Sequence, residues 1–243
     1  MKNTIEENIG AANVNGSEHC VGPADDTPGS TGSAAGRVCF RPICRADYPI
    51  LADLINSTWG FDKMHDDPAV LRHFGLRYLY TCLIKHTFDL VAEIDGKAAG
   101  IIIEADYGAD RTSLKYLALY YYHTAYLTLR RAFSAFHDVN ERYDRIMREM
   151  DDFCKEKGDT ELALFILDER CRGLGIGDRL YHEFEKHCRE NGIEDFYVHT
   201  DTACSYLFYE YQGMKLLHSR KTDICYAGSE NVTMLLYGKK LQG

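Results

Sequence analysis

Hydrophobic residues recur along the chain with two periods, which together predict an α/β domain beginning near Arg37. The segment RVCFRPI at 37–43 predicts a strand, and apolar residues at helical spacing in 46–61 and 72–85 predict two helices. Two apolar runs, 90–94 and 98–104, flank Asp95 and Gly96. Both of these residues tolerate positive φ, so this pair of runs predicts a β-hairpin.

Residues 113–157 form a long connection with a helical pattern, and we interpret them as a helical insert. Aromatic residues crowd its first half and charged residues its second. The uncharged stretch 116–129 is shorter than the roughly 20 residues of a membrane helix. We expect its apolar surface to be buried by the second half folding back as a helical hairpin. The alternatives are a wall of the substrate site or a homodimer contact.

Residues 1–36 differ in composition from the rest of the chain. They are rich in Gly, Ser, Ala, Asn and Asp and contain few large apolar residues. Such a segment cannot bury enough apolar surface to offset the entropy of ordering, so we predict a disordered tail before a domain at 37–243.

Charge and cysteine content narrow the function classes. The net charge of -9 provides no basic field for nucleic acid or anionic membranes, so neither partner is expected. The nine cysteines are odd in number and lack Cys-x-x-Cys spacing, which favours reduced thiols in the cytoplasm and no metal site.

The most informative stretch is 161–191, where a buried strand meets three alternate glycines and then an amphipathic helix. LALFIL is an uninterrupted apolar run, and Leu180, Tyr181, Phe184 and Cys188 share one helical face. Glycines in the turn allow a close approach of the backbone, and the first helical turn leaves N–H groups without partners. The pattern predicts a pyrophosphate site at the helix N-terminus, with a cation from Arg172 beside it.

Two common phosphate-binding patterns fit this turn poorly. A Rossmann turn requires G-x-G-x-x-G, whereas the spacing here is G-x-G-x-G, and a P-loop requires a Lys-Ser or Lys-Thr that is missing. The [QR]-x-x-G-x-[GA] pattern is met by Arg172, Gly175 and Gly177, and YLFYEYQGM follows about 30 residues later. In these features the sequence resembles the GNAT superfamily of acyl-CoA-dependent N-acyltransferases.

The resemblance covers residues 161–214 best and implies a fold and a cofactor site. The implied fold is a mixed, mostly antiparallel central sheet flanked by helices, with the insert between the third and fourth strands. The implied cosubstrate is acetyl-CoA. Backbone groups at the end of the fourth strand would bind its pantetheine arm, and the turn would hold its pyrophosphate. These positions are Ile166, Leu167, Arg172, Gly173, Leu174, Gly175, Ile176 and Gly177.

The resemblance also implies two catalytic residues. Tyr209 matches the family's tyrosine and would protonate the leaving thiolate, since a phenol with a pKa of about 10 holds its proton at neutral pH; the alternative is a packed core aromatic. Glu161 is the first candidate for the general base, against a solvated carboxylate at a strand end. His199 and Asp201 are weaker candidates. The family often has Asn where this chain has Thr202.

The function implied is transfer of an acetyl or short acyl group from coenzyme A to a primary amine, by direct attack in a ternary complex. The acceptor would be a small molecule or a peptide. Two alternatives stay open: an acyl-CoA-binding sensor or interaction domain without activity, and, ranked lower, a Rossmann-type oxidoreductase.

Overall fold

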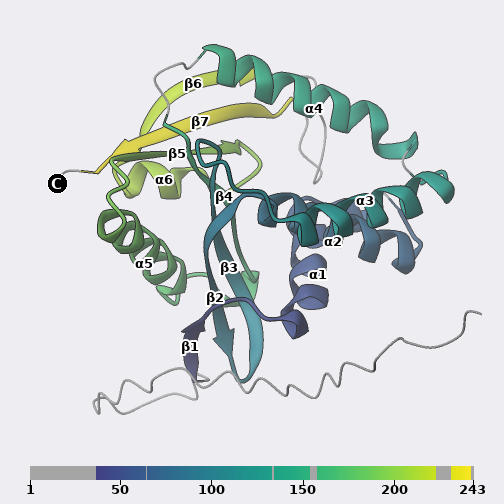
Figure 1. The fold of residues 1–243 in the computed structure, drawn as a ribbon, viewed down its shortest axis with the longest axis horizontal. Helices are drawn as coiled ribbons and strands as arrows, with labels where there is room; N and C mark the ends of the chain where they lie inside the picture. The colour runs from purple at the N-terminus through teal and green to yellow at the C-terminus, as the bar shows by residue number, and fades with distance from the viewer. Residues whose placement is uncertain (1–36, 64, 133, 154–157, 223–230, 242–243) are drawn as a thin grey trace, which may run out of the picture. The chain divides into compact units, whose positions relative to one another are not determined.

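The structure, a computed structural model, describes residues 37–63, 65–132, 134–153, 158–222 and 231–241. In this part of the chain one sheet has the strand order β1-β2-β3-β4-β5-β7-β6 (Figure 1). The strands are β1 (Val38–Arg41), β2 (His86–Ile94), β3 (Lys97–Asp106), β4 (Thr160–Leu167), β5 (Asp195–Asp201), β6 (Lys215–Lys221) and β7 (Thr233–Lys240). The helices are α1 (Tyr48–Thr58), α2 (Pro68–Leu83), α3 (Leu114–Leu129), α4 (Ser134–Phe153), α5 (Ile176–Glu190) and α6 (Leu207–Tyr211).

The sheet is mixed and mostly antiparallel, as predicted. β4 and β5 are parallel, and all the other neighbouring strands pair antiparallel. The hairpin turn between β2 and β3 is confirmed, with φ of 51° at Asp95 and 78° at Gly96. The Rossmann alternative is excluded because that fold requires a mainly parallel sheet.

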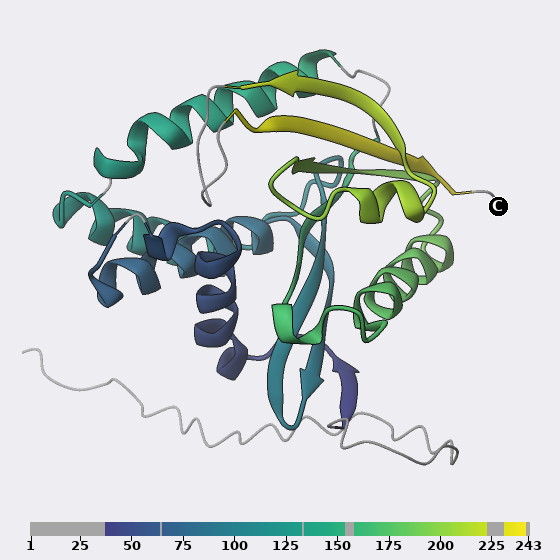
Figure 2. The same cartoon turned by 180° about the vertical axis from the view of Figure 1, so that it is seen from behind.

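β4 and β5 separate soon after they meet. Among the described residues their register contains one pair, Glu161 with Tyr197. Beyond this pair β4 continues beside β3, while β5 turns away with β7 and β6, a divergence visible from both sides (Figures 1 and 2). In the described part of the chain, one backbone edge of the β4 C-terminal half therefore has no strand beside it.

Helices cover both faces of the sheet. The predicted apolar face of α5 is confirmed, because Leu180, Tyr181, Phe184 and Cys188 are fully buried in a core that includes residues of β3, β4, β5 and β7. α1 and α2 pack on the opposite face, where Leu51, Ile55, Leu79 and Leu83 are fully buried against Ile101 and Ile103 of β3.

Within 113–153 the described residues form the helices α3 and α4, but the expected fold-back hairpin is wrong for them. α3 packs along α2 instead, burying Tyr116, His123 and Leu127. α4 packs on the β5–β7–β6 half of the sheet, with Ile146 and Met150 against Met234 and Leu236. Two separate surfaces were available to the two helices, so neither needed the other for burial.

The helix predicted near Tyr209 is short, since α6 spans Leu207–Tyr211 after a series of turns. Cysteines 39, 44, 82, 171, 188 and 204 are free thiols, while the predicted disordered tail at 1–36 lies outside the described residues. No helix in the described ranges is both long and apolar enough to cross a membrane.

Candidate active site

The glycine turn connects β4 to α5, as the sequence pattern predicts. Gly173 and Gly175 have φ of 76° and 73°, values that other residues rarely adopt. Gly175 is the N-cap of α5, and no side chain caps the helix. The amide of Arg179 donates to the Gly175 carbonyl at 3.1 Å, so the amides before it have no carbonyl partner in this helix.

The two last glycines of the motif have different surroundings. A Cβ on Gly175 would meet no atom within 4 Å and would project into open space. A Cβ on Gly177 would point back at β4 and lie 3.7 Å from the Phe165 ring, an ordinary contact. Gly175 therefore borders the open side of the turn, whereas position 177 has room for a methyl group inside the protein.

The other predicted residues of the turn are arranged around this opening. The Arg172 side chain is 53% exposed and lies 3.5 Å from Glu169. Leu174 is 63% exposed, whereas the Ile176 side chain is buried in the core, so only its backbone is available to a ligand. The turn thus presents glycine backbone, uncapped amides and the half-exposed Arg172 side chain close together.

The end of β4 leads directly into this turn. Ile166 and Leu167 pair on one edge with Ile101 and Gly100 of β3, and the amide of Asp168 donates to Ala99 at 2.8 Å. Their other edge faces the gap between β4 and β5. An extended ligand could hydrogen-bond to this edge as an additional strand would.

Tyr209 lies on α6 in the core beneath the sheet. The residue is 8% exposed, and its ring centroid lies 6.1 Å from that of Tyr237. Its hydroxyl has no hydrogen-bond partner within the described residues. Burial, followed by the nearby Cys204 and Asp201, raises the pKa of Tyr209, so the phenol keeps its proton at neutral pH. It is a packed aromatic whose hydroxyl is still available as a proton donor.

Glu161 is not the solvated strand-end carboxylate of the alternative interpretation. Its side chain is 15% exposed, and Nδ1 of His199 lies 2.8 Å from its Oε1. On the other side of the imidazole, Nε2 of His199 lies 3.0 Å from Oδ1 of Asp151, an ion-pair distance without the alignment of a hydrogen bond. Burial opposes a charge on His199, but the contacts with Asp151 and Glu161 outweigh it and raise the pKa of His199.

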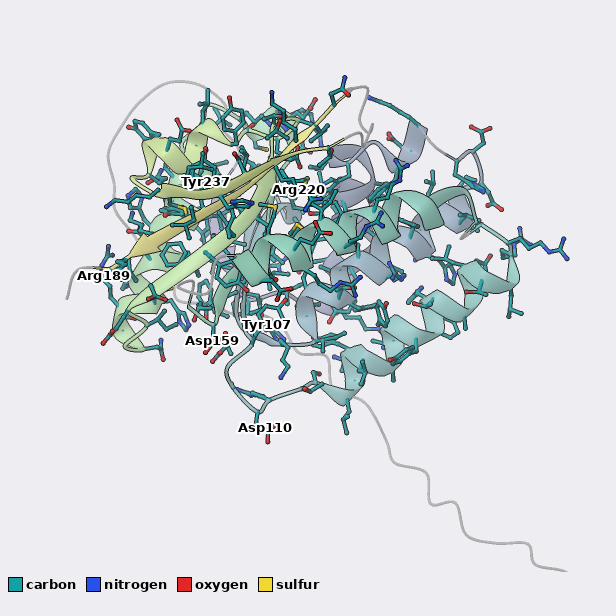
Figure 3. All side chains as sticks on the ribbon, turned by 90° about the horizontal axis from the view of Figure 1, so that it is seen from above. Tyr107, Asp110, Asp159, Arg189, Arg220 and Tyr237 are labelled. Carbon is teal, nitrogen blue, oxygen red and sulfur yellow. The ribbon has the colours of Figure 1, made fainter. Side chains whose placement is uncertain are left out.

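Two tyrosines, Tyr107 and Tyr197, lie near this carboxylate–imidazole–carboxylate group. The Tyr107 amide donates to Asp159 at 3.0 Å next to the start of β4, and the two residues are neighbours in Figure 3. Burial, and then the charge of Glu161, raise the pKa values of Tyr107 and Tyr197, even though 51% of Tyr107 is exposed. Both phenols therefore stay neutral hydrogen-bond donors.

The two remaining polar candidates have structural partners. Asp201 accepts hydrogen bonds from the amides of Ala203 and Cys204, so its side chain caps the turn that follows β5. The Thr202 hydroxyl accepts a hydrogen bond from the Thr233 amide of β7 at 3.0 Å. Both side chains are thus engaged with backbone amides, whereas the Glu161 carboxylate contacts the His199 imidazole.

A cavity of about 460 Å³ between α4 and β6 is separate from this group. Its walls are mainly cationic, and in Figure 3 Arg220 of β6 lies beside α4, where it forms an ion pair with Glu149. The cavity is lined by Arg142, Arg145, Ile146, Glu149, Arg220, Lys221 and Thr222. None of these residues belongs to the glycine turn, the β4 edge or the Glu161 group.

Sequence reasoning missed the contribution of α4 and of the loop after β3. Asp151 lies among many charged residues of an exposed-looking helix, so no local pattern distinguishes it from Asp152. Its position depends on α4 packing across β5, which is a tertiary event. From the sequence His199 is only a weaker candidate, because a lone histidine near a strand end is more often a hydrogen-bonded structural residue, and its carboxylate partners are 38 and 48 residues away in the chain.

Comparison with known proteins agrees with this geometry. Residues 49–214 match the family model described as the acetyltransferase (GNAT) family. Arylalkylamine N-acetyltransferase 2 from Aedes aegypti superposes with a TM-score of 0.56 at 15% identity, covering 84% of this chain and 99% of its own. The protein smu.2055 from Streptococcus mutans UA159 superposes with a TM-score of 0.51 at 16% identity, covering 84% and 99%. No curated protein matches in sequence. Because the family model covers most of the chain, the protein belongs to the GNAT acetyltransferase family.

Proposed function

We propose that the protein transfers an acetyl or short acyl group from coenzyme A to a primary amine. The observation that supports this most strongly is the continuous path from the open edge of β4 into the uncapped glycine turn. The pantetheine arm would bind along Ile166 and Leu167. The pyrophosphate would bind to the backbone from Gly173 to Gly177, where the helix N-terminus favours an anion, with Arg172 beside it.

The side chains nearby support direct attack in a ternary complex. The amine nitrogen attacks the thioester carbon, and the carbon–sulfur bond then breaks. Glu161 accepts the proton that the nitrogen loses, directly or through a water molecule, and Tyr209 gives its proton to the departing thiolate. The immediate products are an amide, a thiol, a protonated Glu161 and a Tyr209 phenolate. Proton exchange with solvent then restores both side chains, so that one proton has moved in net from nitrogen to sulfur.

The state of each residue is compatible with its proposed role. Tyr209 is protonated and its hydroxyl has no partner in the described part of the chain, so a sulfur atom can accept its proton. Glu161 accepts a hydrogen bond from His199 on Oε1, and a carboxylate has further lone pairs for a second donor.

The donor site is tested by calorimetric titration of acetyl-CoA into the wild type, Gly175→Ala and Gly177→Ala. Gly175→Ala puts a methyl group in the open side of the turn and also strains a backbone whose φ is 73°, and together these effects should weaken binding at least about 10-fold. Gly177→Ala is the matched control, because its methyl group contacts Phe165 and should leave affinity unchanged. Equal affinity of all three proteins would overturn the proposed donor site.

Catalysis is tested separately by measuring thiol release over a panel of primary amines, including arylalkylamines, polyamines and peptide N-termini. Turnover of at least one amine is expected. Tight acetyl-CoA binding without turnover of any amine would contradict the proposed activity and favour an acyl-CoA-binding domain without catalysis.

A further inference from the structure

The connection between β3 and β4 contributes a carboxylate to the group around Glu161. Asp151 is near the C-terminal end of α4, and its Oδ1 lies 3.0 Å from Nε2 of His199. The imidazole is 6% exposed, and its other nitrogen, Nδ1, contacts Glu161 at 2.8 Å. One buried histidine therefore links α4 to the residue that we propose as the general base.

The position of Asp151 is determined by the packing of α4 on the sheet. Met150, the preceding residue, is fully buried with Tyr197, Met234 and Leu236, and Ile146 lies one turn earlier in the same cluster. On the β6 side, Glu149 pairs with Arg220. The apolar cluster and this ion pair hold α4 against the sheet. They place the carboxylate of Asp151 next to His199 of β5.

The groups facing His199 come from each element that packs around it. They are Asp151 from α4, Glu161 from β4, and the Tyr197 ring on β5, whose centroid is 5.4 Å from the imidazole. On β7 the opposing residue is Leu236, which is apolar. With a carboxylate at each nitrogen, the imidazole can carry a proton on both, and Asp151 and Glu161 both raise the pKa of His199.

We propose that Asp151 is a positioning residue of the active site, which acts through His199 to hold the Glu161 carboxylate in place for the acceptor amine. This inference rests on the proposed function of Glu161. Without Asp151, Nε2 loses its anionic partner and the imidazole can adopt either neutral tautomer. One of these tautomers has no proton on Nδ1 and cannot donate to Glu161.

The experiment compares Asp151→Asn, which is nearly isosteric, with Asp151→Glu, which keeps the charge. Asp152→Asn is the matched control, since Asp152 is the next residue of α4 and is exposed. Ring ¹⁵N NMR of His199, assigned with His199→Gln, reports its ionisation without any substrate. Steady-state kinetics on the amine turned over by the wild type give kcat, KM and the pH profile.

We expect Asp151→Asn to lower the pKa of His199 in the NMR titration and to lower kcat about 10- to 100-fold, by analogy with the loss of a carboxylate that orients a metal-bound histidine. KM for acetyl-CoA should not change. Asp151→Glu should recover part of both effects, and Asp152→Asn should match the wild type. Partial recovery by the glutamate separates a role of the charge from damage to α4.

Two results would overturn the inference, and they are distinguishable. Unchanged His199 ionisation and unchanged kcat in Asp151→Asn would show that the contact does not position the site, although the proposed activity would stand. Absence of turnover by the wild type, with a normal NMR response of His199 to Asp151→Asn, would instead remove the proposed activity and the catalytic role with it.

Discussion

At the scale of single residues, Tyr209 combines a packed ring with an available hydroxyl. Tyr209→Phe should lower kcat by about 10²- to 10⁴-fold while acetyl-CoA affinity changes little, because only the proton donor is lost. The free energy of unfolding should change by less than about 1 kcal/mol, since the hydroxyl makes no hydrogen bond within the described residues. The measurements are single-turnover kinetics and urea denaturation. Wild-type turnover in the variant would mean that Tyr209 serves packing only.

His199 gives a prediction for stability as a function of pH. Its pKa is raised in the folded protein, so its charge stabilises the fold below the unfolded pKa of about 6.5, and this contribution disappears as pH rises through the folded pKa. His199→Gln should therefore lose about 1–3 kcal/mol at pH 6. The loss should be smaller at pH 9. Urea denaturation at both pH values checks this, and a pH-independent difference between the two proteins would contradict it.

Some of these residues could be identified from the sequence and others could not, because only some belong to a local pattern. Tyr209 and Gly175 belong to local patterns, in which a turn or helix fixes the spacing between a residue and its neighbours. The role of Glu161 could be proposed from its place at the start of a strand, but its partners could not. His199 approaches it because β4 and β5 pair at Glu161 and Tyr197, and Asp151 approaches because α4 crosses β5.

At the scale of elements, the α2–α3 interface contains a histidine whose pKa is lowered, whereas that of His199 is raised. His123 is 6% exposed, and its Nδ1 lies 3.0 Å from Nδ1 of His73. Burial, and then the charge of His73, lower the pKa of His123 to about 4. The His73 ring also stacks on Tyr126 of α3, with centroids 3.5 Å apart. The two helices therefore pack through neutral imidazoles.

Acidification should weaken this interface. A histidine with a lowered folded pKa destabilises the fold as pH falls below about 6.5, because the unfolded chain binds the proton more readily. From pH 7 to pH 5 the contribution of His123 is about 2 kcal/mol, at about 1.4 kcal/mol per pH unit. Between pH 7 and pH 5, the free energy of unfolding of His123→Gln should therefore fall by about 2 kcal/mol less than that of the wild type. Urea denaturation at both pH values provides the comparison, and parallel losses in the two proteins would argue against a neutral His123.

The helices and strands themselves were easier to predict from the sequence than the elements against which they pack. Period and turn chemistry sufficed for the β2–β3 hairpin, for α5 and for the presence of helices in 113–157. They did not indicate that α3 would pack on α2 and α4 on the β7–β6 half, because an apolar helical face does not specify its partner. α6 is shorter than its aromatic pattern suggested, because residues 202–206 form turns whose first amides are bound by Asp201, and the helix begins only at Leu207.

At the scale of the whole domain, the sheet consists of two halves that share one pair between β4 and β5. β1 to β4 form one half, and β5, β7 and β6 form the other. The α5 core joins them on one face, because it contains Leu162 of β4 together with Phe196 and Val198 of β5. A ligand bound along the β4 edge and in the glycine turn would add a further connection between the halves.

Acetyl-CoA should therefore protect regions that are distant in sequence when hydrogen exchange is measured. At about 100 times its Kd it should stabilise the fold by about 2.7 kcal/mol. Exchange should slow both in peptides covering the end of β4 and in those covering the turn at 172–178. Adenosine 3′,5′-bisphosphate is the control, because it lacks the pantetheine arm and cannot reach Ile166 and Leu167. It should leave the β4 peptides unprotected. If acetyl-CoA slowed exchange in the turn alone, the open edge of β4 would not be the pantetheine site, and the separation of β4 from β5 would need another explanation.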